Sequence, residues 1–97
     1  MAKAIKAWFG TDTYGRHVEV AQREDGKFFA RHEHFNGYAK ANTPWYSHNP
    51  TFETHGVNAY SGEEFEYSEP QLFWGFNKMS CYANAASGDK INLRLPN

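Results

Sequence analysis

The sequence lacks a second cysteine and has no long hydrophobic run. A lone cysteine, Cys81, cannot form a disulfide within the chain and leaves no thiolate cluster for zinc. The first ten residues, MAKAIKAWFG, contain neither the apolar run nor the small-residue cleavage site of a signal peptide. No segment approaches the roughly 20 apolar residues of a membrane-spanning helix. We therefore expect a cytoplasmic protein with no membrane partner.

The motifs of common enzymes are also missing. The sequence contains no Gly-x-Ser-x-Gly, no glycine-rich phosphate loop and no His-Glu-x-x-His. Cys81 has no catalytic-cysteine signature around it. Glutamates such as Glu63, Glu64 and Glu66 could flank a sugar as acid and nucleophile, but any acidic run would place carboxylates in this way. The sequence therefore predicts a protein that is not an enzyme, with no catalytic residues and no cofactor.

What the sequence has in quantity is aromatic side chains, which make up 18% of its 97 residues. A chain of this length corresponds to one domain, so we expect a single domain over residues 1–97. Phe, Tyr and Trp provide large contact areas at little cost in side-chain entropy, and they serve both small cores and binding surfaces. The aromatic content therefore favours a compact fold and is compatible with a binding role.

Charge is nearly balanced overall but uneven along the chain. Ten basic residues stand against 11 acidic ones, yet residues 41–97 hold only three of the basic residues and six of the acidic ones. The densest acidic stretch, EEFEYSE, places Glu63, Glu64 and Glu66 beside Tyr67. Such a stretch is either a solvated edge strand or an acidic, aromatic patch for a basic partner.

Alternating apolar residues predict four strands. They are KAIKAWF at 3–9, RHVEVAQR at 16–23, FFARHEHF at 28–35 and KINLRL at 90–95, the last with Ile91, Leu93 and Leu95 facing inward. The EDGK sequence between the second and third strands is the strongest hairpin signal in the chain. A long loop with Trp45 and Tyr46 is expected from residue 38 to 56, followed by a short hairpin around Ser61-Gly62.

The segment from Ser68 to Gly88 has the features of a helix. Ser68 can cap its N-terminus, Gly88 can end it, and an apolar stripe recurs at helical spacing at Leu72, Phe76, Met79, Ala83 and Ala86. Gly75 weakens this prediction, and residues 71–76 could instead form a strand. The expected fold class is α+β, a small antiparallel β-sheet with one C-terminal helix packed on it. An all-β fold is the alternative.

The histidines of RHEHFNG raise the question of a metal site, because His32 and His34 are spaced to share one face of a strand. A two-residue turn at Asp25-Gly26 would place His17 opposite His34 and Glu19 opposite His32. That register would gather three imidazoles and one carboxylate on one side of the sheet.

A three-residue loop, Glu24 to Gly26, would shift every pairing by one residue. Val18 would then face His32, Val20 would face Ala30, and Glu19 would face Arg31. We favour this second register because it gathers the apolar side chains on one face and places opposite charges across from each other. It moves His17 to the other side of the sheet, so no bound metal is expected.

These observations favour a small non-enzymatic module that binds another protein. Its type resembles the inhibitory or accessory proteins that phages and mobile elements direct against a larger host protein or complex, although no family resemblance is identified. Trp74 would face solvent on the expected helix and is the foremost candidate contact. The candidate partner-binding residues are Trp74, Trp8, Trp45, Tyr46, Glu63, Glu64, Glu66 and Tyr67.

Two alternatives remain open at this point. One is a single-stranded nucleic-acid-binding domain that stacks bases on Trp8 beside Lys6, although a net charge of −1 disfavours it. The other is a small enzyme or metal-binding protein that uses the region of His17, His32 and His34.

Overall fold

The computed structural model describes residues 2–32, 43–74 and 77–97. Within them the chain is built from eight strands, and the one helical element is a short 3₁₀ turn, η1 (Ala85–Ser87). The strands are β1 (Ala2–Thr11), β2 (His17–Arg23), β3 (Phe28–His32), β4 (Tyr46–Ser47), β5 (Thr51–Val57), β6 (Glu64–Trp74), β7 (Asn77–Asn84) and β8 (Arg94–Leu95). The expected α+β class is therefore wrong, and the structure favours the all-β alternative.

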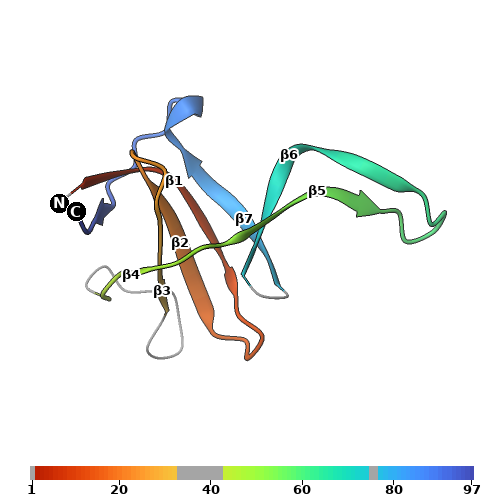
Figure 1. Ribbon diagram of the computed structural model, residues 1–97, viewed down its shortest axis with the longest axis horizontal. Helices are drawn as coiled ribbons and strands as arrows, with labels where there is room; N and C mark the ends of the chain where they lie inside the picture. The colour runs from red at the N-terminus through yellow and green to blue at the C-terminus, as the bar shows by residue number, and fades with distance from the viewer. Residues whose placement is uncertain (1, 33–42, 75–76) are drawn as a thin grey trace.

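The strands form one antiparallel sheet in the order β4-β3-β2-β1-β7-β6-β5, with β8 paired to β1 outside this path. The two outermost strands, β4 and β5, are neighbours in sequence, so one segment runs from one edge of the sheet to the other (Figure 1). The His48 backbone N–H donates to the Phe28 carbonyl at 3.0 Å, which extends the pairing of this segment with β3. We call residues 46–57, from β4 to β5, the crossing segment. Because it joins the two edges of the sheet, the sheet curls over one of its faces.

The hairpin of β2 and β3 has the favoured register. Val18 pairs with His32, Glu19 with Arg31 and Val20 with Ala30. The loop is the three-residue one, and its Gly26 has a φ of 92°, a left-handed conformation that glycine adopts without a steric penalty. The register prediction is therefore confirmed over these pairs. Glu33 and His34 lie outside the described residues.

Beneath the crossing segment lies the first core cluster. Its buried members are Trp8, Val18, Val20, Ala30, Leu72 and Met79. Phe52 of β5 closes over it, with its ring centroid 6.2 Å from that of Trp8 and 5.5 Å from that of Phe28. Val18 and Val20 of β2, and Phe28 and Ala30 of β3, alternate along their strands, as a strand with one face against a core requires.

A second cluster covers the opposite face of the sheet. Its buried members are Ala4, Ala7, Ala21, Phe29 and Leu95, against which Trp45, Ala83, Ile91 and Leu93 pack. The C-terminal segment therefore lies against the sheet with its alternating apolar residues inward, as predicted. Only Arg94–Leu95 of the expected strand at 90–95 is a strand in the structure.

The segment expected to be a helix forms β6 and β7 instead. Leu72 pairs with Met79 across the two strands, and both are buried, so these two members of the predicted stripe face the core from two strands. Ala83 packs against the second cluster and Ala86 is exposed, so the stripe as a whole is not reproduced. The helix from which an exposed Trp74 was inferred is therefore absent, and the exposure of the Trp74 side chain stays a prediction. Trp74 is the last residue of β6 and pairs with Asn77, while its side chain and Phe76 lie outside the described part.

Candidate functional site: the β5–β6 arm

One part of the sheet leaves the body of the molecule. We call residues 53–69 the arm, which consists of the outer ends of β5 and β6 and the turn between them (Figure 1). None of its residues is buried, and only Gly56 and Tyr67 are partly covered. The molecule measures 46 × 31 × 20 Å, and its radius of gyration of 14.3 Å exceeds the roughly 12.5 Å expected for a compact domain of this length. The arm accounts for this elongated shape.

An irregularity in strand pairing marks where the arm begins. Glu53 pairs with Gln71, but the next pair is His55 with Glu66, so residues 67–70 of β6 stand opposite Thr54 alone. Such bulges bend a strand and strengthen its twist. Pro70 belongs to this bulge, where the missing backbone N–H costs no ladder hydrogen bond. The bulge also carries Glu69, whose carboxylate lies 3.8 Å from the Lys6 ammonium of β1.

Beyond the bulge the arm is a regular hairpin closed by an ordered turn. The Asn58 side-chain oxygen accepts hydrogen bonds from the backbone N–H groups of Tyr60 (2.8 Å) and Ser61 (3.1 Å). Gly62, with a φ of 73°, donates its N–H to the Asn58 carbonyl at 2.9 Å. The predicted hairpin around Ser61-Gly62 is confirmed. No local pattern indicated that this hairpin would project from the sheet.

One face of the arm is aromatic. Phe65 and Tyr67 alternate along β6, and their rings meet edge to face with centroids 5.2 Å apart. Both rings lie over Gly56, where an added Cβ would be 2.6 Å from the Tyr67 Oη and 2.8 Å from the Phe65 Cζ. Phe65 remains 45% exposed. The rings thus stiffen a two-stranded ribbon and still present apolar surface to solvent.

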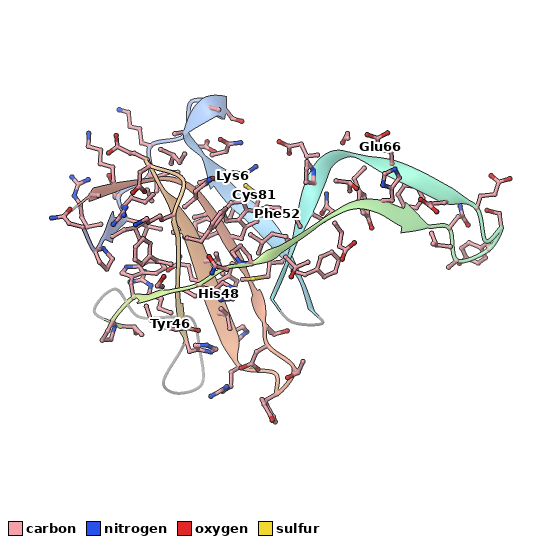
Figure 2. The ribbon with its side chains drawn as sticks, viewed as in Figure 1. Lys6, Tyr46, His48, Phe52, Glu66 and Cys81 are labelled. Carbon is pink, nitrogen blue, oxygen red and sulfur yellow. The ribbon has the colours of Figure 1, made fainter. Side chains whose placement is uncertain are left out.

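The other face of the arm is acidic. Glu64 and Glu66 point to the side opposite Phe65 and Tyr67, because successive side chains of a strand alternate, and Figure 2 shows Glu66 far from the body of the sheet. They pair across the strands with Val57 and His55. The sequence has five glutamates between residues 53 and 69 and no lysine or arginine between residues 41 and 77. The arm therefore carries a concentrated negative charge.

The structure brings some of the predicted contact residues together and separates others. Glu63, Glu64, Glu66 and Tyr67 all lie in the arm. Trp8 does not belong with them, because it is only 3% exposed and lies in the first core cluster. Its assignment to a partner surface is wrong. Trp8 is buried because Phe52 and Phe28 cover the face of β1 on which it lies, a face for which the sequence pattern indicated no covering residues.

Trp45 is half-buried and has a structural role. Its ring packs on the second cluster, and the Arg31 guanidinium lies 4.2 Å from the ring centroid. Arg31 in turn donates from Nε to the Glu19 carboxylate at 2.6 Å, and the Tyr82 hydroxyl donates to the other oxygen of that carboxylate. The pKa of Tyr82 is raised by burial and by its hydrogen bond to Glu19. Trp45 thus covers a buried ion pair.

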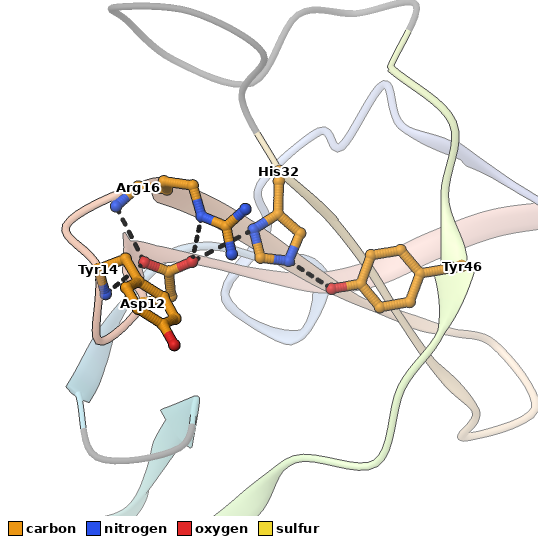
Figure 3. Close-up of polar contacts among 5 residues, drawn as sticks. All are labelled: Asp12, Tyr14, Arg16, His32 and Tyr46. Atoms are coloured by element: carbon orange, nitrogen blue, oxygen red, sulfur yellow. Dashed lines mark hydrogen bonds and ion pairs between the residues drawn. The ribbon is translucent and has the colours of Figure 1, made fainter.

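Tyr46 belongs to a polar cluster at the end of β3 (Figure 3). Its hydroxyl lies 2.6 Å from the His32 Nε2, and the two rings stack with an interplanar angle of 6°. The His32 Nδ1 lies 3.7 Å from an Asp12 carboxylate oxygen. Asp12 also accepts from the Arg16 Nε at 2.8 Å and from the Tyr14 N–H at 2.9 Å.

The electrostatics of this cluster favour a structural tie over an acid–base centre. Burial and the nearby Arg16 cation lower the pKa of His32, and burial raises the pKa of Tyr46 to about 12. Burial alone would raise the pKa of Asp12, but hydrogen bonds from Arg16 and Tyr14 hold it below its ordinary value. A neutral histidine is thus held between a carboxylate and a neutral phenol. This arrangement fastens β4 to β3.

The histidines singled out in the sequence do not converge in the described structure. His17 lies on the other face of the sheet from His32, where its ring stacks on Phe9 with centroids 5.4 Å apart. His34 lies outside the described residues. Among the residues with described positions, no three His, Cys, Asp or Glu side chains are grouped as metal ligands would be. That the protein needs no metal stays a prediction.

Comparison of the chain with protein-family models, curated proteins and solved structures finds no match. Within the described ranges, no helix has the length and apolar character needed to cross a membrane.

Proposed function

We propose that the protein is a non-enzymatic module that binds another protein through its arm. The observation that carries this proposal is the composition of the arm. It is exposed on both faces, yet it holds an ordered pair of aromatic rings on one face and a row of carboxylates on the other. An isolated two-stranded hairpin is marginally stable in water, and neither core cluster of the described residues includes a residue of the arm. Binding of a partner protein to the arm would account for this extension.

Exposed apolar and aromatic side chains of the arm supply the anchors. Phe65 is 45% exposed, Val57 is 65% exposed on the opposite face, and Tyr60 is fully exposed at the turn. Aromatic side chains that become buried at the centre of an interface are typical hot spots, whose truncation costs roughly 2 kcal/mol or more of binding energy. Because the backbone of the arm is already ordered by the Asn58 turn, little conformational entropy is lost when a partner covers it.

The acidic face selects the partner by charge. Glu64 and Glu66 lie on this face, and the arm as a whole has five glutamates and no lysine or arginine of its own, so it attracts a basic surface and repels an acidic one. The partner is therefore a larger protein with a basic, partly apolar groove, and the module acts on it as an inhibitor or accessory subunit. The same charge opposes a nucleic-acid ligand, whose phosphates the arm would repel.

The nucleic-acid alternative also lacks the base-stacking surface that was expected at Trp8 and Lys6. Trp8 is buried and cannot stack on a base, and the Lys6 ammonium is 3.8 Å from the Glu69 carboxylate. The enzyme alternative has no added support from the described geometry, because His17 and His32 lie on opposite faces of the sheet.

The test begins with the tagged protein in cells of its natural source and the identification of chains that co-purify at a fixed ratio. The purified partner is then titrated with the wild-type protein, with Glu64→Gln/Glu66→Gln, and with the matched control Glu24→Gln/Asp89→Asn. The control removes the same charge from exposed carboxylates outside the arm.

We expect the arm variant to associate several-fold more slowly at low salt, with little difference at high salt, and the control to behave as wild type. Equal effects of the two variants would show that only net charge matters and would contradict the role of the arm. Recovery of nucleic acid in place of a protein would favour the first alternative, and turnover of a substrate by the isolated chain would favour the second.

A further inference from the structure

A second charged feature lies at the other end of the molecule. An open depression of about 370 Å³ is lined by the start of β1, by the β2–β3 turn, by the first residue of η1 and by the segment that leads into β8. The chain termini mark this end in Figure 1, and the turn of the arm is at the opposite end. A depression of this size has room for side chains and not for a folded element.

The rim of the depression is basic. Lys3, Lys90 and Arg94 line it, against a single carboxylate from Glu24. Among the described residues, no carboxylate lies within ion-pair distance of these three cations. Ile5 and Ile91 contribute apolar surface to the same depression. The depression therefore combines unpaired positive charge with an apolar lining.

The pairing of β1 with β8 makes this charge costly to the free protein. Lys3 stands directly across from Arg94 in the antiparallel ladder. Like charges at directly opposed positions destabilise a sheet, and an anionic group placed between them relieves that repulsion. The ligand that suits the depression is thus anionic and carries an apolar or aromatic side chain.

The arm has this chemistry, with a fully exposed Tyr60 at its turn and Glu63 and Glu64 next to it. We propose that the arm of one copy docks in the basic depression of a second copy. The arm and the depression are at opposite ends of one molecule, so the arm of a chain cannot bind in the depression of the same chain. Symmetric pairing of two arms is disfavoured, because it would bring two sets of five glutamates together.

This head-to-tail contact is heterologous, so repetition of it produces open chains of molecules and not a closed dimer. The contact area that a depression of this size offers is small, which places the interaction among weak, concentration-dependent contacts. This mode of association rests on the proposed role of the arm as a binding element. It would also limit the amount of free arm at high protein concentration.

The test uses sedimentation velocity of the full-length protein and two variants over a wide range of concentrations. The arm variant is Tyr60→Ser/Glu63→Gln/Glu64→Gln, and the depression variant is Lys90→Gln/Arg94→Gln. All five side chains are exposed, so both variants should keep the wild-type melting temperature, which is checked first. Neutral replacements are chosen because charge reversals could create a new attraction between the two variants.

We expect the wild-type protein to form species larger than a dimer as concentration rises and to lose them at high salt. Each variant alone should stay monomeric. An equal mixture should form 1:1 dimers and nothing larger, because one variant supplies the only working arm and the other the only working depression.

A wild-type protein that stays monomeric, or a mixture that gives no dimer, would overturn head-to-tail docking. Self-association that survives in the depression variant would also overturn it. These outcomes leave the proposed function intact if the arm variant still loses affinity for the co-purified partner. Unchanged partner affinity in the arm variant would contradict the proposed function separately.

Discussion

Removing one partner of the buried Glu19–Arg31 pair should destabilise the fold strongly, and this perturbation tests the structure in detail. Both side chains are nearly covered, with 11% and 6% of their surfaces exposed, and the Arg31 Nε lies 2.6 Å from the Glu19 carboxylate. Replacing Arg31 with Met keeps most of the side-chain volume under Trp45 but leaves the carboxylate without its cation. Breaking a buried pair in this way costs roughly 3 to 5 kcal/mol, because an uncompensated charge remains inside the protein.

The double variant should cost much less than the two single changes combined. Glu19→Leu/Arg31→Met removes both charges, and apolar replacement of a whole buried pair is often close to neutral in stability. Tyr82→Phe, which removes only the hydroxyl that donates to Glu19, should cost about 1 to 2 kcal/mol and should fold even if the single charge variants do not.

The assay is urea unfolding at neutral pH, followed by tryptophan fluorescence, with the free energy of unfolding compared across the four members of the cycle. A loss below about 1 kcal/mol for Arg31→Met, or a double variant whose loss equals the sum of the single losses, would refute the interpretation of this pair as buried and coupled.

Three further predictions follow from the same structure. Burial lowers the pKa of His32 and His48 below the ordinary 6.5, so the unfolded chain takes up protons first as pH falls. The free energy of unfolding should therefore decrease as the pH is lowered past about 6.5. A free energy of unfolding that stays constant from pH 7.5 to 5 in urea titrations would contradict this. Leu72→Ala should destabilise the fold by roughly 2 to 5 kcal/mol in the same unfolding assay, because Leu72 is fully buried; a loss below about 1 kcal/mol would argue against its place in the core. Gly56→Ala should displace the two rings of the aromatic face, because an added Cβ would clash with them. It should weaken partner binding by about tenfold or more while the free energy of unfolding falls by less than about 1.5 kcal/mol. A Gly56→Ala protein with wild-type affinity would show that the aromatic face is not used in binding.

The parts of the fold that follow local patterns were predictable. The β2–β3 register followed from the alignment of Val18 and Val20 with Ala30, and from Glu19 opposite Arg31, because a slip of one residue would have separated both sets. The C-terminal segment was placed inward for the same reason. In both segments apolar residues recur at every second position, and this alternation identifies the face of the strand that is buried.

The helix prediction failed because one apolar pattern suited two structures. Leu72 and Met79 face the core whether seven residues of helix separate them or two strands pair them directly. Gly75 is a poor residue for a helix interior, but Pro70 falls in the first turn of the predicted helix, where proline is tolerated, so the plausible N-terminal cap at Ser68 carried the prediction. The pairing of β7 with β1, which stabilises the strand form, joins residues more than 70 positions apart and leaves no local signal.

The binding surface was predictable in composition but not in shape. The run from Glu63 to Tyr67 indicated an acidic, aromatic stretch, and Asn58 with Gly62 indicated a turn. That this hairpin projects depends on the bulge of residues 67–70, and the burial of Trp8 depends on Phe52 arriving from a distant strand. The basic depression was missed because Lys3 and Arg94 are adjacent only through the β1–β8 pairing.

The most direct test of the arm as the binding surface is site-specific photo-crosslinking in cells of the natural source. Benzoylphenylalanine replaces Phe65 on the aromatic face in one protein and Tyr14, which is 83% exposed in the turn after β1, in a control. If the arm is the binding surface, position 65 crosslinks to one defined protein and position 14 does not. Excess wild-type protein abolishes the crosslink, and excess Glu64→Gln/Glu66→Gln competes less well. Crosslinking of the same protein from position 14 but not from position 65, or no crosslink from the arm under conditions where the partner co-purifies, would contradict this role of the arm.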